Sequence, residues 1–247
     1  MNLFRGQLHA DGLTSVKFVH LDVTDAATIH AAKETIEKAE EKLDVLVNNA
    51  GMLQVNQLWN DNLSVSDVAT GVANTELNQY PATLLLSTVR GVMEVNFFGA
   101  VQTTVTLLPL MRKSTNGGAI VNVTSMMGSN SFQANPTRTF RSSPLYAFSA
   151  YSMSKAALNS YTIALSHELK AEGIKVNTVS PGHTATKMST YNGKTTRAGA
   201  EVLLPWVLLE KDGPTGTRPE SAVDISGRWY LISTGRFIDH DQTEAPW

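Results

Sequence analysis

Three side chains in the second half of the sequence could carry out acid/base chemistry. Tyr151 and Lys155 are four positions apart, so on a helix they would lie one turn apart on the same face. A phenol with a pKa of about 10 is a poor proton donor or acceptor at neutral pH, and a neighbouring ammonium would lower that pKa. Ser125 follows an apolar stretch typical of a strand and could hydrogen-bond a substrate oxygen. The trio predicts proton transfer to or from a carbonyl or hydroxyl group.

The elements that must position these side chains alternate between strands and helices. Strands are predicted at 16–21, 44–47, 119–123 and 174–179, and helices at 25–42, 87–113 and 151–171, from β-branched runs and from apolar residues at three- and four-residue steps. Asp25 is the predicted N-cap of the first helix. This alternation predicts an α/β fold with a doubly wound parallel sheet, in which ligands bind beyond the carboxyl ends of the strands. Polar or turn residues follow each predicted strand: Asp22, Asn49, Ser125 and Pro181-Gly182.

Composition narrows the class of protein. A chain of 247 residues, 42% hydrophobic and 17% charged, can bury the core of one α/β domain. The net charge of −2, without a basic stripe, argues against nucleic acid or an anionic membrane as a partner. No apolar run has the length of a signal peptide or membrane span, so we expect a soluble, cytoplasmic protein. Cysteine is absent, and Asp239, His240 and Asp241 are expected to be solvated, so no metal site is predicted.

Six motifs occur in a fixed order along the chain. They are LDVTD at 21–25, NNAG at 48–51, VNFFG at 95–99, VNVTSMMG at 121–128, YSMSKAALN at 151–159 and VNTVSPGHTAT at 176–186. This succession resembles the short-chain dehydrogenase/reductase family. The segments LLPLMRKS, SKAALN and DGPTG are similar to those of its carbonyl-reductase-like branch. The resemblance covers residues 1–216, which we interpret as a Rossmann-like domain, and leaves 217–247 as a C-terminal tail.

The resemblance implies an oxidoreductase that transfers a hydride between a nicotinamide cofactor and a ketone or secondary alcohol. It favours NADP(H) over NAD(H) and implies a homo-oligomer formed through the helices at 87–113 and 151–171. The implied catalytic residues are Asn96, which supports a proton-relay water, with Ser125, Tyr151 and Lys155. The implied cofactor-binding residues are Asp22, Asn49, Ala50, Gly51, Tyr151, Lys155, Thr184 and Thr186.

The residues to which the resemblance assigns a role could also have a purely structural one. Asp22 could cap a turn, and Asn49 could satisfy backbone groups at a strand end. Asn96 could bend its own helix by bonding nearby carbonyls. A tyrosine and a lysine at the spacing of Tyr151 and Lys155 also occur by chance on many helices. The pair therefore indicates a catalytic site only together with the surrounding motifs.

Besides the unmatched tail, the sequence departs from the family pattern in two places. No GxxxGxG follows a predicted strand, so the first strand–glycine turn–helix–strand unit, which holds the pyrophosphate, is expected to be lacking. The strands at 16–21 and 44–47 would then either pair directly or leave a central sheet edge exposed. The segment 126–150 is longer than in compact relatives and is expected to fold away from the site. Its residues Phe132, Phe140, Arg141 and Tyr146 could line a substrate pocket or form surface.

Two rival functions follow from the missing glycine turn. The chain could be a cofactor-deficient relative that serves as a binding or oligomerisation module. It could also be a non-redox enzyme that uses Tyr151 and Ser125 for acid/base chemistry in the vacant cofactor groove.

Overall fold

The structure is a computed structural model that describes residues 15–53, 79–115, 117–134, 137, 143–189 and 191–208, together with the short strands named below. The helices are α2 (Ala26–Glu40), α4 (Leu86–Met93), α5 (Gly99–Met111), α6 (Asn130–Gln133), α7 (Ser149–Glu168), α8 (Thr196–Glu201) and α9 (Leu204–Val207). Short 3₁₀ turns are η1 (Pro81–Thr83), η3 (Met126–Gly128), η4 (Leu145–Ala147), η5 (Leu169–Glu172) and η6 (Lys187–Ser189), and η2 (Glu94–Phe98) is a π-helix.

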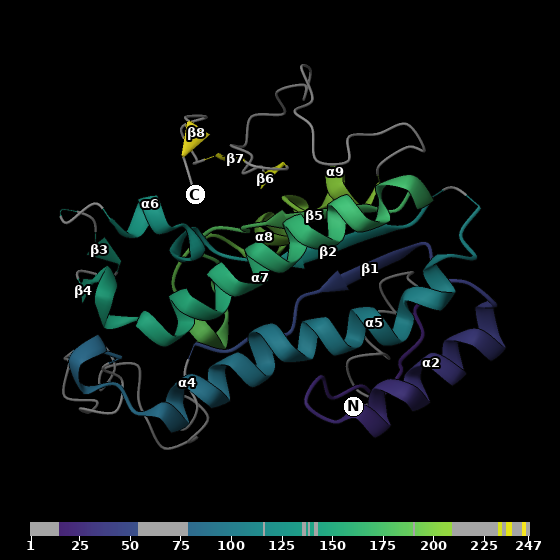
Figure 1. Cartoon of the computed structure of the whole chain (residues 1–247), viewed down its shortest axis with the longest axis horizontal. Helices are drawn as coiled ribbons and strands as arrows, with labels where there is room; N and C mark the ends of the chain where they lie inside the picture. The colour runs from purple at the N-terminus through teal and green to yellow at the C-terminus, as the bar shows by residue number, and fades with distance from the viewer. Residues whose placement is uncertain are drawn as a thin grey trace.

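A six-stranded sheet runs through the centre of the molecule in the order β1-β2-β5-β6-β7-β8 (Figure 1). Its strands are β1 (Val45–Asn48), β2 (Ala119–Val123), β5 (Lys175–Val179), β6 (Ile232–Ser233), β7 (Arg236–Ile238) and β8 (Glu244–Ala245). β1, β2 and β5 pair in parallel, so that Ile120 lies opposite Leu46 on one side and Val176 on the other. The parallel α/β sheet predicted from the sequence is therefore confirmed.

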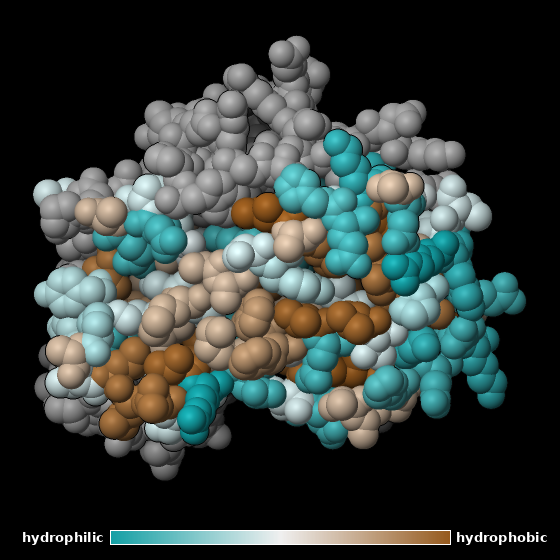
Figure 2. Space-filling view, in the orientation of Figure 1, coloured by the Kyte–Doolittle hydropathy of each residue, from teal (hydrophilic) through white to brown (hydrophobic). Residues whose placement is uncertain are grey.

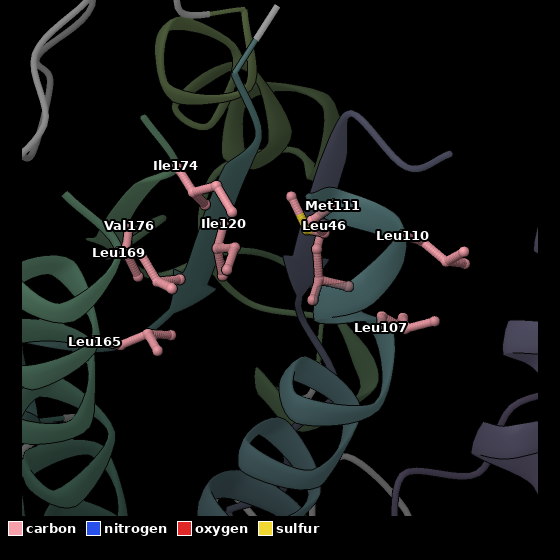
Figure 3. Close-up of a cluster of buried hydrophobic side chains, with 9 residues drawn as sticks. All are labelled: Leu46, Leu107, Leu110, Met111, Ile120, Leu165, Leu169, Ile174 and Val176. Carbon is pink, nitrogen blue, oxygen red and sulfur yellow. The ribbon is translucent and has the colours of Figure 1, made fainter. Parts of the chain in front are cut away.

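Both faces of the parallel strands are covered, because neighbouring residues of β2 point in opposite directions. Ile120 packs into a cluster with residues of α5 and α7 on one face (Figure 3). That cluster comprises Leu46, Leu107, Leu110, Met111, Ile120, Leu165, Leu169, Ile174 and Val176. Val121 packs on the other face with Val179, Val202 and Trp206, the last two lying at the end of α8 and in α9. Helices on both sides of a parallel sheet make the fold doubly wound.

The helices begin and end where local chemistry predicts. The Asp25 carboxylate accepts a hydrogen bond from the backbone N–H of Ala27 at 2.9 Å and caps α2, as predicted. Pro109 lies inside α5, which ends two residues later at Met111. After α7, the turn η5 closes at Gly173, whose φ of 72° is the left-handed conformation that favours glycine.

The strand predicted at 16–21 is wrong. These residues form no strand, and Lys17 instead forms an ion pair with Glu40 at the end of α2. A β-branched, alternating sequence becomes a strand only when a neighbouring strand completes its hydrogen bonds, and no described strand lies beside this segment. β1 is therefore an edge of the described sheet, and its residue Val47 is 38% exposed. Of the two expected outcomes, direct pairing of 16–21 with 44–47 or an exposed sheet edge, the structure shows the exposed edge.

Both of the longer segments contain short strands that pair antiparallel. In 126–150, β3 (Thr139–Phe140) pairs antiparallel with β4 (Ser143–Pro144). Beyond residue 216, β6 pairs antiparallel with β5 through Thr178 and Ile232, and β7 and β8 follow antiparallel. The sheet therefore continues past the predicted end of the domain, and the division at residue 216 stays a prediction.

Candidate active site

Ser125, Tyr151 and Lys155 meet beyond the carboxyl end of β2. Tyr151 lies in the first turn of α7 and Lys155 in the next turn, while Ser125 directly precedes η3. The Ser125 side chain lies close enough to the Tyr151 phenol to lower the pKa of that group. The Lys155 ammonium lies 5.8 Å from the centre of the Tyr151 ring and donates to the carbonyl of Val123, the last residue of β2, at 2.8 Å. The fold thus brings the predicted acid/base residues together.

Burial controls the ionisation of both groups. Tyr151 is 9% exposed and Lys155 4% exposed. Burial raises the pKa of Tyr151 to about 12, with the hydrogen bond from Ser125 acting in the opposite direction. Burial also lowers the pKa of Lys155 to about 8. The pKa of Tyr151 therefore lies above its ordinary value and not below it, contrary to the expectation from its spacing to Lys155. Desolvation is the largest cause, and the Lys155 ammonium donates to the Val123 carbonyl.

An apolar wall surrounds the Tyr151 ring. Leu53, Met127 and Leu145 form a buried cluster with Tyr151, against which Phe132, Phe148 and Met188 pack. Part of the segment 126–150 therefore folds over the site and not away from it, which corrects the prediction. The physical reason is that its apolar side chains are buried there against the Tyr151 ring.

The aromatic residues of that segment separate into different environments. Phe132 contacts the Tyr151 cluster, whereas Tyr146 is 57% exposed and packs on Tyr80 with ring centres 5.4 Å apart. Arg141 and the side chain of Phe140 lie outside the described residues. Phe132 is thus the member of the predicted set that the structure places beside the site.

Asn96 holds the loop after β1 against α7. It is 1% exposed, and its Oδ1 accepts from the backbone N–H of Met52 at 2.7 Å. Its Nδ2 donates to the Met52 carbonyl and to Ser154 Oγ at 2.8 and 2.9 Å. The side chain bonds other segments and not carbonyls of its own helix, so the helix-bending alternative is wrong. Asn96 does lie in the π-turn η2, a local widening that occurs often at functional sites.

The glycine of the NNAG motif lies beside the Lys155 ammonium. A Cβ at Gly51 would lie 3.5 Å from Lys155 Nζ and 3.4 Å from Asn96 Oδ1. Asn49 and Ala50 are exposed just after β1. The predicted cofactor residues of this motif therefore border the Lys155 side of the site.

The remaining predicted cofactor residues are held by local contacts. Asp22 is exposed, and its carboxylate accepts from the backbone N–H and hydroxyl of Thr24 at 2.9 and 2.7 Å, which lowers its pKa. Asp22 thus makes the turn contact of its structural alternative and no described contact to the Tyr151 group. Thr184 and Thr186 lie half-buried in the loop after β5, where the Thr184 hydroxyl donates to the Gly182 carbonyl at 3.2 Å.

Sequence reasoning missed Gln79, which is 1% exposed and bonds both Leu53 and Tyr151. It lies in a polar stretch between the predicted strands and helices, and no local pattern marks it.

Sequence reasoning also missed a buried network beneath the site. Asn48 donates to Thr104 and to Asn122, and Asn122 donates to Thr162, all at 2.7–2.8 Å. This network ties β1 and β2 to α5 and α7.

Two absences hold for the described part of the chain. No group of histidine, aspartate and glutamate there could hold a metal ion, and Asp239, His240 and Asp241 lie outside it. None of its helices is long and apolar enough to cross a membrane.

Solved structures share this architecture. Salutaridine reductase from Papaver somniferum superposes with a TM-score of 0.64 at 25% identity, over 87% of this chain and 85% of that one. Carbonyl reductase from chicken fatty liver, in an NADPH-bound crystal structure, gives 0.64 at 20% identity over 99% and 82% of the chains. The second likeness, at lower identity, supports the fold alone.

Sequence comparison identifies the family. (+)-Neomenthol dehydrogenase of Capsicum annuum is 30% identical over 245 residues, covering 81% of this chain and 77% of that enzyme. 17-beta-hydroxysteroid dehydrogenase type 2 of Homo sapiens is 33% identical over 82% of this chain, which spans only 44% of the human protein. A model of the short chain dehydrogenase family matches residues 4–197. The chain therefore belongs to the short-chain dehydrogenase/reductase family.

Proposed function

We propose that the protein reduces ketones to secondary alcohols, or catalyses the reverse oxidation, with a nicotinamide cofactor that exchanges the hydride. The observation that carries this proposal is the meeting of Ser125 with the buried Tyr151 and Lys155 beyond the carboxyl end of β2. The proposed cofactor is NADP(H) in preference to NAD(H), by the resemblance to carbonyl reductases.

Tyr151 is the proposed acid. As hydride reaches the carbonyl carbon, the Tyr151 O–H bond breaks and its proton passes to the carbonyl oxygen, which leaves an alcohol and a phenolate. A pKa of about 12 keeps the phenol protonated at neutral pH, so its proton is present when the substrate binds. A phenol with this pKa is a weak acid, so the proton transfer needs other groups to stabilise the charge that develops.

Ser125 and Lys155 assist that step in the proposal. The Ser125 hydroxyl, already in contact with the phenol, would donate a hydrogen bond to the carbonyl oxygen as negative charge develops on it. The Lys155 ammonium, near the Tyr151 ring, would stabilise the phenolate that remains.

The residues present fit the nicotinamide and ribose end of the cofactor. Gly51 leaves space beside the Lys155 ammonium, which can donate to ribose hydroxyls. Asn49 and Ala50 would border the ribose. Thr184 and Thr186 would lie along the nicotinamide amide and the pyrophosphate. Asp22 would contact the adenine ring once its carboxylate, held by Thr24, is shared with the ligand. Asn96 would support the water of a proton relay through its position in the π-turn η2.

The apolar wall supports an apolar carbonyl substrate. Leu53, Met127, Leu145 and Phe132 surround the Tyr151 ring without a charged side chain among them. A substrate buried against this wall gains free energy from apolar contact, whereas a charged group placed against the wall pays desolvation without a partner in the wall itself. We therefore propose an uncharged ketone or secondary alcohol as the substrate class.

Replacement of Tyr151 by phenylalanine tests the enzyme directly. Removal of the transferable proton should lower turnover by on the order of 100- to 10,000-fold and leave the circular dichroism spectrum unchanged. Tyr161→Phe is a matched control in the same helix, where Tyr161 packs edge-on against Phe97, and it should keep turnover. Undiminished turnover in Tyr151→Phe would reject Tyr151 as the acid.

The cofactor-deficient binding module is the second candidate, because the Asp22 carboxylate is engaged in a turn with Thr24. Titration of NADPH against intrinsic fluorescence separates the two, with Trp206 as a buried reporter beside β2. Saturable binding supports the enzyme. A folded protein without binding at millimolar cofactor supports the module, and turnover without cofactor supports a non-redox acid/base enzyme.

We also propose that the protein forms a homo-oligomer through its helical face. Figure 2 shows apolar side chains gathered over α4, at the lower left, where Leu85 and Leu86 are 66% and 69% exposed. Phe98, Val105 and Met153 are also exposed on η2, α5 and α7. Exposed apolar surface of this kind favours association. Light scattering coupled to gel filtration should give a mass above 26.8 kDa, and Val105→Lys should shift it toward the monomer.

A further inference from the structure

Gln79 lies between the helix that carries Tyr151 and the loop that follows β1. Its side-chain Oε1 accepts from the backbone N–H of Tyr151 at 3.0 Å, and its Nε2 donates to the Leu53 carbonyl at 2.7 Å. Its own backbone N–H donates to the Ala147 carbonyl at 3.0 Å. A reversed amide would set donor against donor and acceptor against acceptor, so these contacts fix its orientation.

The start of α7 needs an acceptor from elsewhere. The first N–H groups of a helix have no partner within it, and a polar side chain at the N-cap normally accepts one of them. Phe148 occupies the N-cap of α7 and has no side-chain acceptor. Gln79, 72 residues away in sequence, supplies the missing oxygen. Because the positive end of the helix lies there, an amide oxygen is favoured at this position.

The other end of the Gln79 amide holds the loop 49–53. This loop brings Gly51 beside the Lys155 ammonium and contributes Leu53 to the apolar wall around Tyr151. A single buried amide therefore joins the backbone of the loop to the backbone of Tyr151 itself. With 1% of its surface exposed, Gln79 leaves water no route to replace either bond.

We propose that Gln79 is a positioning residue that sets the Tyr151 hydroxyl against Ser125 and the bound carbonyl. It touches no reacting atom and acts through the helix start and the loop. The inference rests on the proposed oxidoreductase function, so one arm of its test does not depend on turnover.

The first arm measures hydrogen exchange at the Tyr151 amide in protein labelled with ¹⁵N-tyrosine, with Tyr151→Phe used to assign the signal. Gln79→Met keeps the side-chain length and removes both hydrogen bonds. Exchange at Tyr151 should accelerate about tenfold, the effect of one lost hydrogen bond, while the Tyr161 amide further along α7 should be unchanged. An unchanged rate at Tyr151 overturns the capping role, whether or not the protein is active.

The second arm measures steady-state reduction of a panel of apolar ketones. A phenol displaced from its partner should lower kcat by on the order of 10- to 100-fold and leave KM within about threefold, because binding contacts remain. Equal kcat for wild type and Gln79→Met, or a rise in KM alone, overturns the proposal. A wild-type protein that reduces no ketone counts against the oxidoreductase function, and the exchange arm then decides the role of Gln79.

Two further variants separate positioning from loss of fold. Gln102→Met removes a comparable amide bond to a loop carbonyl, that of Val23, and should leave kcat and Tyr151 exchange unchanged. Gln79→Glu keeps the acceptor for Tyr151 and loses the donor for Leu53. It should retain slow exchange at Tyr151 and give a kcat between those of wild type and Gln79→Met, and it decides the question if the methionine variant does not fold. Exchange in Gln79→Glu as fast as in an unfolded chain would overturn the proposal.

Discussion

Replacement of Lys155 by methionine should stabilise the ligand-free protein at neutral pH. Lys155 is 4% exposed, and desolvation lowers its pKa to about 8 from the usual 10.5. Between these values the unfolded chain binds more protons than the folded one, so wild-type stability rises as pH rises through this window. The buried ammonium thus costs about 3 kcal/mol near pH 7 and roughly 1.4 kcal/mol near pH 9.5. Methionine, which carries no charge, removes that cost.

The loss of the Lys155 hydrogen bond to Val123 offsets about 1 kcal/mol of this gain at either pH. The variant should therefore exceed wild type in free energy of unfolding by about 2 kcal/mol near pH 7, and the difference should shrink by about 2 kcal/mol near pH 9.5. Urea unfolding followed by circular dichroism at the two pH values measures both quantities. Lys113→Met, at an exposed ion pair with Glu37, is the control and should show no such pH dependence. A Lys155→Met difference that stays constant across the two pH values would refute the burial argument.

Two other substitutions test the packing that supports the site. Ile120→Ala, in the buried cluster between β2 and the helices, should lower the free energy of unfolding by about 2–5 kcal/mol, whereas Glu34→Ala on the exposed side of α2 should change it by less than about 0.5 kcal/mol. Gly128→Ala would place its Cβ 2.8 Å from the backbone carbon of Lys155, so α7 must move away. We expect a lower melting temperature and reduced turnover, and a variant that matches wild type in both would show that the contact yields freely.

The sequence predicted the elements whose partners are close or whose pattern is strong. β2 occupies the predicted residues, and α7 begins two residues before the predicted start. Both have buried apolar residues at the period of their secondary structure. The motifs at the end of β2 and at the start of α7 therefore lie close together, as predicted. The meeting of Ser125 with Tyr151 followed from this, because parallel strands and the helices after them share one edge of the sheet.

The failures concern properties that depend on distant parts of the chain. The segment 16–21 has the residues of a strand, but strand pairing requires a neighbour that sequence periodicity cannot supply. The ionisation of Tyr151 was misjudged because the spacing to Lys155 is visible in the sequence and the depth of burial is not. Gln79 escaped notice because its side chain bonds groups 26 and 72 residues away.

The geometry around Tyr151 is supported by contacts on the inner side of the loop that follows β1. The loop after β1 has no described strand at its outer side, yet two buried amides tie it inward to α7. Asn96 joins Met52 to Ser154, and Gln79 joins the next residue, Leu53, to Tyr151. Both ties use neutral amides whose oxygen and nitrogen are each hydrogen-bonded, so each is costly to break in a buried site. The acid/base group therefore depends on β2, α7 and these two amides, which explains how it keeps its arrangement beside an exposed sheet edge.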